Sequence, residues 1–250
     1  MIEIKNLCKS FNDHKVLDNL NLTIDDAETT VIIGRSGCGK SVLLKHIIGV
    51  LKPDSGEVMV DGVDIAKLPA KELDAVRMRF GMLFQGAALF DSLSVADNVG
   101  FALLEHTKLE PRLIERRVKQ CLELVGLKGV GHQKPAELSG GMKKRVGLAR
   151  AICMNPQIML YDEPTTGVDP IMGDAINDLI RELHDRLGVT SIVVTHDMKS
   201  AYKVANKIAM LYKGKIIIKG TVEEVRNSNN PIVQQFITGA ATGPITEQEA

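Results

Sequence analysis

Residues Gly34-Arg35-Ser36-Gly37-Cys38-Gly39-Lys40-Ser41 match the phosphate-binding pattern G-x-x-x-x-G-K-[ST] at every fixed position. The apolar run 30–33 predicts a strand before this loop, and the stretch 41–50 predicts a helix after it. The glycines let successive backbone N–H groups point at phosphate oxygens, and the helix N-terminus adds the positive end of its dipole. Lys40 supplies a charge for the β- and γ-phosphates, and the Ser41 hydroxyl is placed to ligate Mg²⁺. The sequence therefore predicts a site for a nucleoside triphosphate.

Size and charge limit the class of protein. With 250 residues the chain can bury a large core and form one domain with a subdomain. Its formal net charge is zero, so no basic surface for nucleic acid is predicted. We interpret the basic cluster Lys143-Lys144-Arg145 as a solvated helix face or as part of the rim of the nucleotide site.

Cysteine spacing and hydropathy indicate the compartment. Cys8, Cys38, Cys121 and Cys153 show no C-x-x-C spacing, which favours a reducing compartment over a disulfide or metal site. No signal peptide is visible, and no apolar run approaches the ~18 residues that span a bilayer. If the protein works at a membrane, we expect other chains to span it.

The order of predicted elements indicates an α/β fold. Strand patterns, with a hairpin turn at Asp61-Gly62, occupy the N-terminal part at 2–4, 23–24 and 57–60. Helical patterns, the first capped by Ser94, then follow at 95–106, 111–125 and 140–154. Apolar strands return around a helix at 174–187, and a hairpin turn at Lys213-Gly214 leads into the last of them; they lie at 158–161, 191–194, 208–212 and 215–219. Near-continuous apolar strands suit a parallel sheet buried on both faces.

Charged residues at two predicted strand ends complete a catalytic set. Asp162 ends the strand 158–161, where a carboxylate beside a phosphate loop holds Mg²⁺. The next residue, Glu163, is predicted to polarise an attacking water as a general base. His196 ends the strand 191–194 and is predicted to hydrogen-bond the γ-phosphate or to position the water.

A second anion-binding helix start occurs at Leu138-Ser139-Gly140-Gly141-Met142. Ser139 is a good N-cap, and the two glycines lead directly into a helical pattern. One molecule needs only one cradle for the γ-phosphate, so the second predicts a site assembled between two chains.

Taken in order, the phosphate loop, Gln85 after Phe84, the LSGGM segment, the strand ending in Asp162-Glu163, Asp169 and His196 resemble the nucleotide-binding domain of ABC transporters. The resemblance runs from residue 2 to about 225. It implies an ABC nucleotide-binding domain over 1–225, with an N-terminal antiparallel β subdomain, an inserted α-helical subdomain at about 86–156, and a C-terminal extension over 226–250. Met142, Arg35 and Cys38 depart from the family's common residues without removing a side chain that contacts phosphate.

The resemblance also assigns roles to residues. Ser139, Gly140 and Gly141 would cap the ATP of a partner chain in a head-to-tail homodimer, and Asp169 would cross the dimer interface. Gln85 would contact Mg²⁺ and sense the membrane partner, so it joins Ser41 and Asp162 as a metal ligand and Glu163 and His196 as a catalytic residue. Phe11 would stack on adenine, and Val16 belongs to the same nucleotide site.

Two segments resemble one group within this family. The stretches 82–93 and 141–150 are similar to the Mla-type ATPases that power Mce-protein lipid transport between the bacterial inner and outer membranes. That resemblance implies a permease docking near Gln85–Leu93, an Mce-domain lipid-binding partner, possible binding of a small regulatory subunit, and a location on the cytoplasmic face of the inner membrane.

Two alternatives stay open, namely an ABC importer ATPase with another substrate and an ATP-gated clamp that signals without transport. A DNA-repair or translation ABC protein would need long insertions that this chain lacks. The apolar tail residues Ile232, Val233, Phe236 and Ile237 further predict that the C-terminal extension contacts a neighbouring chain.

Overall fold

The structure is a computed structural model that describes residues 1–247. The chain divides into two compact units: unit 1 comprises residues 1–68 and the chain from 192 onward, and unit 2 comprises residues 69–191. The last three residues of the predicted C-terminal extension lie outside the described residues. The sequence-based division at residues 225 and 226, with a helical subdomain at about 86–156, stays a prediction.

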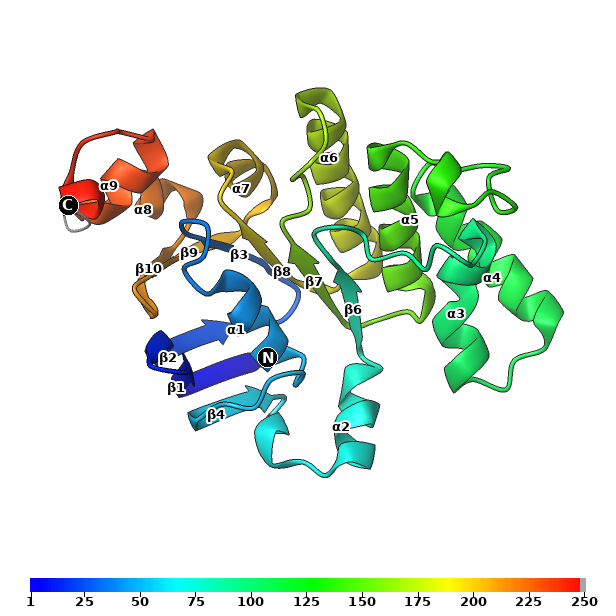
Figure 1. The fold of residues 1–250 in the computed structure, drawn as a ribbon, viewed down its shortest axis with the longest axis horizontal. Helices are drawn as coiled ribbons and strands as arrows, with labels where there is room; N and C mark the ends of the chain where they lie inside the picture. Colours follow the sequence, from blue (N-terminus) through cyan, green and yellow to red (C-terminus); the bar gives the residue numbers. More distant parts are fainter. Residues whose placement is uncertain (248–250) are drawn as a thin grey trace. The chain divides into compact units, whose positions relative to one another are not determined.

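Unit 1 contains an antiparallel sheet built from long amphipathic strands (Figure 1). Its strand order is β2-β1-β4-β5, with bounds β1 (Ile2–Phe11), β2 (His14–Ile24), β4 (Ser55–Val60) and β5 (Val63–Asp64). The β4–β5 hairpin turns at Asp61 and Gly62, whose φ angles of 48° and 80° are those a tight primed turn requires. The predicted Asp-Gly hairpin is therefore confirmed.

The second sheet of unit 1 carries the phosphate loop. Its strands follow the order β10-β9-β3-β8, with bounds β3 (Thr29–Ile33), β8 (Thr190–Thr195, of which the last four residues belong to unit 1), β9 (Lys207–Tyr212) and β10 (Lys215–Gly220). β3 pairs with β9 in parallel, and all five residues of β3 are buried. Helix α1 (Lys40–Ile47) follows the loop, and α7 (Met198–Val204) follows β8. The loop therefore sits at the carboxyl end of a buried parallel strand, as the sequence predicts.

Unit 2 combines two parallel strands with a group of helices. β6 (Phe80–Leu83) pairs with β7 (Ile158–Asp162). The helices are α2 (Ala70–Arg77), α3 (Val95–His106), α4 (Pro111–Leu124), α5 (Gly140–Cys153) and α6 (Pro170–Leu187). Helices α3, α4 and α5 pack on one another and lie side by side in Figure 1. Ser94 caps α3 through a capping box with Asp97, which confirms the predicted start of that helix.

Three short helices end the described chain: α8 (Val222–Arg226), α9 (Pro231–Thr238) and α10 (Pro244–Glu247). Val233 of α9 is fully buried within the chain's own fold, whereas Ile232, Phe236 and Ile237 are partly exposed. The Gln235 side chain ties α9 to α10, because its Oε1 accepts a hydrogen bond of 2.7 Å from the Ile245 N–H. The tail thus packs on its own chain through Val233, and a contact with a neighbouring chain stays a prediction for its exposed residues.

Several elements differ from the sequence-based expectation. Helix α6 begins four residues before the predicted 174, because Asp169 caps it and Pro170 occupies its first turn. α2, β6, α7, α8 and α10 were not predicted. Strand β6 is only four residues long and contains Gly81, a poor strand former. A Cβ at Gly81 would lie 2.4 Å from the Ala151 carbonyl oxygen, so close packing by α5 explains the glycine.

Candidate functional site

The predicted site residues divide between the two units. The phosphate loop, Phe11, Val16 and His196 belong to unit 1, whereas Gln85, Ser139 to Gly141, Asp162, Glu163 and Asp169 belong to unit 2.

The phosphate loop folds tightly around its own lysine. Lys40 is the first residue of α1 and is buried, and its Nζ donates hydrogen bonds to the carbonyl oxygens of Gly34 (2.7 Å) and Arg35 (3.0 Å). Gly39 has a φ of 106°, and a Cβ there would lie 3.0 Å from Cγ1 of Val16. The backbone thus takes a path that a side chain would obstruct, which is the geometry of a phosphate cradle.

A pocket of about 400 Å³ lies against this loop within unit 1. Its lining includes Val16 and the loop residues Arg35 to Cys38, and it is completed by His14, Lys15, Tyr212, Lys213 and Gly214. The pocket can therefore accept a group attached to phosphates bound in the loop. Phe11 is exposed and does not line the pocket, although Lys9 Nζ lies 5.7 Å from its ring centroid. His196 follows β8 and is exposed.

The paired carboxylates of unit 2 lie at the end of β7, as predicted. Asp162 and Glu163 are each only 8% exposed. Glu163 adopts a left-handed backbone conformation with φ of 48°, which is strained for a residue with a side chain. Its Oε2 accepts a hydrogen bond of 3.3 Å from the Thr166 hydroxyl, a partner that the sequence analysis missed. A buried carboxylate on a strained turn is typical of a catalytic position.

The Ser139 segment and Asp169 lie at two neighbouring helix starts. Ser139 caps α5 by accepting a hydrogen bond of 3.3 Å from the Met142 N–H. Asp169 caps α6 by accepting bonds of 3.0 Å from the N–H groups of Ile171 and Met172. A Cβ at Gly141 would lie 2.5 Å from Met172 Cε, so the Ser139 segment packs directly on α6. Two helix N-termini on one unit provide a surface that favours an anion.

Of the two interpretations of the basic cluster on α5, the solvated helix face is wrong for Lys144, whereas the rim of the nucleotide site stays a prediction. Lys144 is buried, with only 5% of its surface exposed, so the cluster is not simply a solvated face. Its Nζ donates hydrogen bonds to the carbonyl oxygens of Gln85 and Glu163. The only sequence signal for this burial is that Lys144 shares the helical stripe of the buried residues Gly141 and Leu148.

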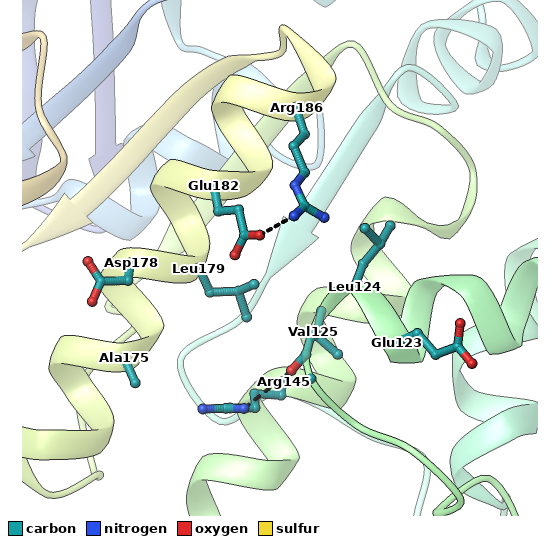
Figure 2. A pocket seen from close by; sticks show the side chains of 10 residues that line it. Glu123, Leu124, Val125, Arg145, Ala175, Asp178, Leu179, Glu182 and Arg186 are labelled. Atoms are coloured by element: carbon teal, nitrogen blue, oxygen red, sulfur yellow. Dashed lines mark hydrogen bonds and ion pairs between the residues drawn. The ribbon is translucent and has the colours of Figure 1, made fainter.

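Another pocket, which lies in unit 2, contains none of the predicted site residues (Figure 2). It has a volume of about 410 Å³ and lies between the end of α4, Arg145 and one face of α6. Arg186 pairs with Glu182 at 2.6 Å, and Arg145 donates to the Val125 carbonyl at 3.4 Å. Both arginines of this pocket thus have a partner in its lining, and the pocket does not form part of the predicted nucleotide site.

Residues 1–247 contain neither a ready-made metal cluster nor a membrane-spanning helix. Within this part of the chain, no cluster of three or more His, Cys, Asp or Glu side chains forms a metal site on its own. Among the helices described, none has the length and hydrophobicity needed to cross a membrane.

The chain is similar in sequence and structure to several known proteins. Residues 17–166 match the family described as ABC transporter. The intermembrane phospholipid transport system ATP-binding protein MlaF of Haemophilus influenzae is 45% identical over 98% of this chain and 93% of that protein. The probable ribonucleotide transport ATP-binding protein mkl of Mycobacterium leprae is 42% identical over 99% of this chain and 72% of that protein. A dimeric post-hydrolysis structure of the ATP-binding cassette MJ0796 with ADP and Pi has a TM-score of 0.82, 33% identity, and coverage of 89% of this chain and 99% of that one.

Proposed function

The chain belongs to the ABC transporter family, and from that membership we propose that it is the ATP-hydrolysing subunit of a transporter that moves phospholipids between the bacterial inner and outer membranes. The observation that carries the substrate assignment is the 45% identity to MlaF over 98% of the chain. Such a subunit powers a separate membrane permease and sits on the cytoplasmic face of the inner membrane.

In this proposal the chain binds ATP through the residues of its phosphate loop. The loop residues from Gly34 to Ser41 hold the phosphates, and the base enters the pocket that Val16 lines. The assignment of Phe11 to the base rests on the family resemblance alone, because Phe11 does not line that pocket. The fit rests on the cradle at Gly39, which a Cβ would fill, and on the buried ammonium of Lys40. By the family resemblance, Ser41, Gln85 and Asp162 would supply oxygen ligands for Mg²⁺, and the ion would neutralise charge on the phosphates.

We assign ATP hydrolysis to Glu163 as the general base and to His196 as a hydrogen-bond donor. Glu163 accepts the proton of the attacking water, a role worth ~10²–10⁴ in rate. Its side chain is held by Thr166, so the carboxylate is oriented before the nucleotide arrives. His196 donates a hydrogen bond to the γ-phosphate.

We propose that two copies share their sites. Each site combines one chain's phosphate loop with Ser139, Gly140 and Gly141 of the other, and Asp169 crosses the interface. The exposed N-cap at Ser139 and the dimeric state of the solved relative support this arrangement. ATP then makes its full set of contacts only in the closed dimer, so ATP binding shifts the equilibrium between open and closed dimers toward the closed form. Hydrolysis of ATP removes this bias and returns the dimer to the open form.

The permease is proposed to dock at Gln85–Leu93. Phe84 and Phe90 are 42% and 45% exposed, which is high for phenylalanine, and the Phe90 ring packs on Phe101 at 4.8 Å. Asn98 is buried and fixes this segment, because it exchanges hydrogen bonds with the backbone N–H and carbonyl of Phe90. An Mce-domain lipid-binding protein and a small regulatory subunit complete the proposed complex.

Purification of the tagged protein from detergent-solubilised membranes, with mass spectrometry of proteins and lipids, tests the proposal. We expect a permease, an Mce-domain protein and phospholipid. Recovery of a different permease with a nucleotide or other small solute would overturn the lipid assignment, and the resemblance to mkl makes that the main competing function. Recovery of a dimer with no membrane partner would favour the ATP-gated clamp.

A further inference from the structure

Helix α5 carries a buried lysine that the proposed function does not use. Lys144 lies five residues after Ser139, and its ammonium group is enclosed within unit 2. Its Nζ donates one hydrogen bond to the carbonyl oxygen of Gln85 and another, of 3.3 Å, to that of Glu163. One cation thus contacts the backbone of two residues that lie 59 and 19 positions away along the chain.

Burial of this charge is costly, so its retention needs a physical reason. Burial lowers the pKa of Lys144, whereas the nearby carboxylates of Asp162 and Glu163 raise it. A methionine has a similar shape and would pack in the same space without desolvating an ammonium group. Methionine, however, cannot donate hydrogen bonds to the two carbonyl oxygens. We therefore infer that the lysine is present because it holds these two carbonyl groups in position.

Both segments that Lys144 holds have strained backbones. Glu163 has a φ of 48°, and the turn after Gln85 contains Ala87 and Ala88 with φ of 60° and 48°. Residues with side chains adopt such angles only where their surroundings enforce them.

The same helix holds the turn after Gln85 at a second point. Arg150, nearly two helical turns after Lys144, donates hydrogen bonds of 2.7 Å to the carbonyl oxygens of Ala87 and Ala88. A Cβ at Gly147 would lie 2.8 Å from Leu83 Cδ1, so α5 also packs closely on the residues before Gln85. Helix α5 therefore contacts the chain on both sides of Gln85, and Lys144 also reaches Glu163.

We propose that Lys144 is a positioning residue that couples the backbone of Gln85, in the segment where the permease docks, to the backbone of the general base Glu163. This inference rests on the proposed function, which assigns the roles of Gln85 and Glu163. A displacement of the docking segment then changes the hydrogen bonding of Lys144 and with it the alignment of the Glu163 carboxylate. We expect Lys144 to act on turnover and not on ATP affinity, because the two backbone groups that it holds belong to Gln85 and to the proposed general base Glu163.

The test compares ATP hydrolysis by the full-length chain carrying Lys144→Met, Lys144→Arg or, as a control, Lys119→Met. Lys119 lies on the exposed side of α4, so its substitution makes the same chemical change without touching buried backbone. For Lys144→Met we expect kcat to fall roughly 10-fold or more with KM within about 3-fold of wild type, because loss of alignment of about 1 Å costs up to ~10² in rate. Lys144→Arg should recover most of the loss, since it keeps the charge and the donors.

Two results would overturn the inference: turnover of Lys144→Met within about 3-fold of wild type, or a Lys144→Arg variant no more active than Lys144→Met. If Lys144→Met does not fold, Lys144→Leu, which also removes the N–H donors, replaces it in the same comparison. Glu163→Gln, measured in parallel, distinguishes an error in the assigned general base from an error in the proposed coupling. Normal turnover in Glu163→Gln would refute the assigned general base, whereas an inactive Glu163→Gln beside a normal Lys144→Met would refute only the coupling.

Discussion

Replacement of Ser139 by alanine should leave the subunit folded and remove its contribution to the partner's site. The exposed hydroxyl accepts one hydrogen bond, from the Met142 N–H, at the long distance of 3.3 Å. A cap this weak belongs at the low end of the usual range, so we expect a loss of about 0.5 kcal/mol. For a chain of this size that lowers the melting temperature by roughly 1–2 °C.

The expected loss of activity is much larger than the loss of stability. A hydrogen bond to a charged group contributes about 1.5–3 kcal/mol, so removal of the contact with the γ-phosphate should slow hydrolysis by roughly 10–150-fold. A variant that melts like wild type and hydrolyses poorly would therefore place Ser139 at a nucleotide rather than in the fold.

A mixing experiment shows whether Ser139 acts on its own chain's ATP or on its partner's. Two differently tagged copies, one Ser139→Ala and one Lys40→Ala, are co-expressed, and the heterodimer is isolated through both tags. In a head-to-tail dimer one site then keeps both a wild-type loop and a wild-type Ser139, whereas each homodimer has none. The control pairs a wild-type copy with a Ser139→Ala, Lys40→Ala double variant, which leaves no complete site.

Single-turnover hydrolysis of ATP by the two heterodimers is the measurement. We expect the first to hydrolyse about one nucleotide per dimer and the control to be as inactive as the parent homodimers. Equal activity in both heterodimers, or a normal rate for Ser139→Ala alone, would refute the shared site.

Glu163→Gln keeps the side-chain shape that Thr166 contacts, so we expect the variant to bind ATP but to turn it over roughly 10²–10⁴-fold more slowly. A near-normal rate of hydrolysis would show that Glu163 is not the general base. Cys38 lines the nucleotide pocket and is partly exposed, so in a Cys8→Ala background its alkylation should slow roughly tenfold when ATP is present at about ten times its Kd, and equal rates would contradict its place in the loop. His46 is buried on α1, where its Nδ1 lies 2.8 Å from the Val42 carbonyl oxygen. Burial is the main cause that lowers the pKa of His46; the hydrogen bond to Val42 opposes this shift, and the charge of Lys9 adds to it. Because the unfolded chain then binds more protons between this lowered value and about 6.5, stability should fall as the pH drops below about 6.5, with a slope of at most ~1.4 kcal/mol per pH unit from this group. Melting temperatures between about pH 7.5 and pH 5.5 should drop less in His46→Gln than in wild type or the exposed control His132→Gln, and parallel curves would contradict the argument.

The sequence predicted the features that depend on a few consecutive residues. The phosphate loop, the Asp61-Gly62 hairpin and the cap at Ser94 are each specified by local backbone dihedrals and hydrogen bonds, and the structure contains all three. The α/β fold class and the membership of the ABC transporter family are also confirmed. The individual roles of the site residues stay predictions.

Only the tertiary structure determined what distant parts of the chain do to one another. Strand β6 was missed because its glycine reflects the close approach of Ala151, not a local preference. From the sequence, Lys144 is expected at the surface, because lysines and clusters of basic residues are usually exposed to solvent. In the structure, its surroundings include carbonyl groups of residues 59 and 19 positions away along the chain, which no local pattern indicates. Short-range chemistry thus specified where a nucleotide can bind, while the folding of remote segments onto helix α5 determined how the residues around the base are held.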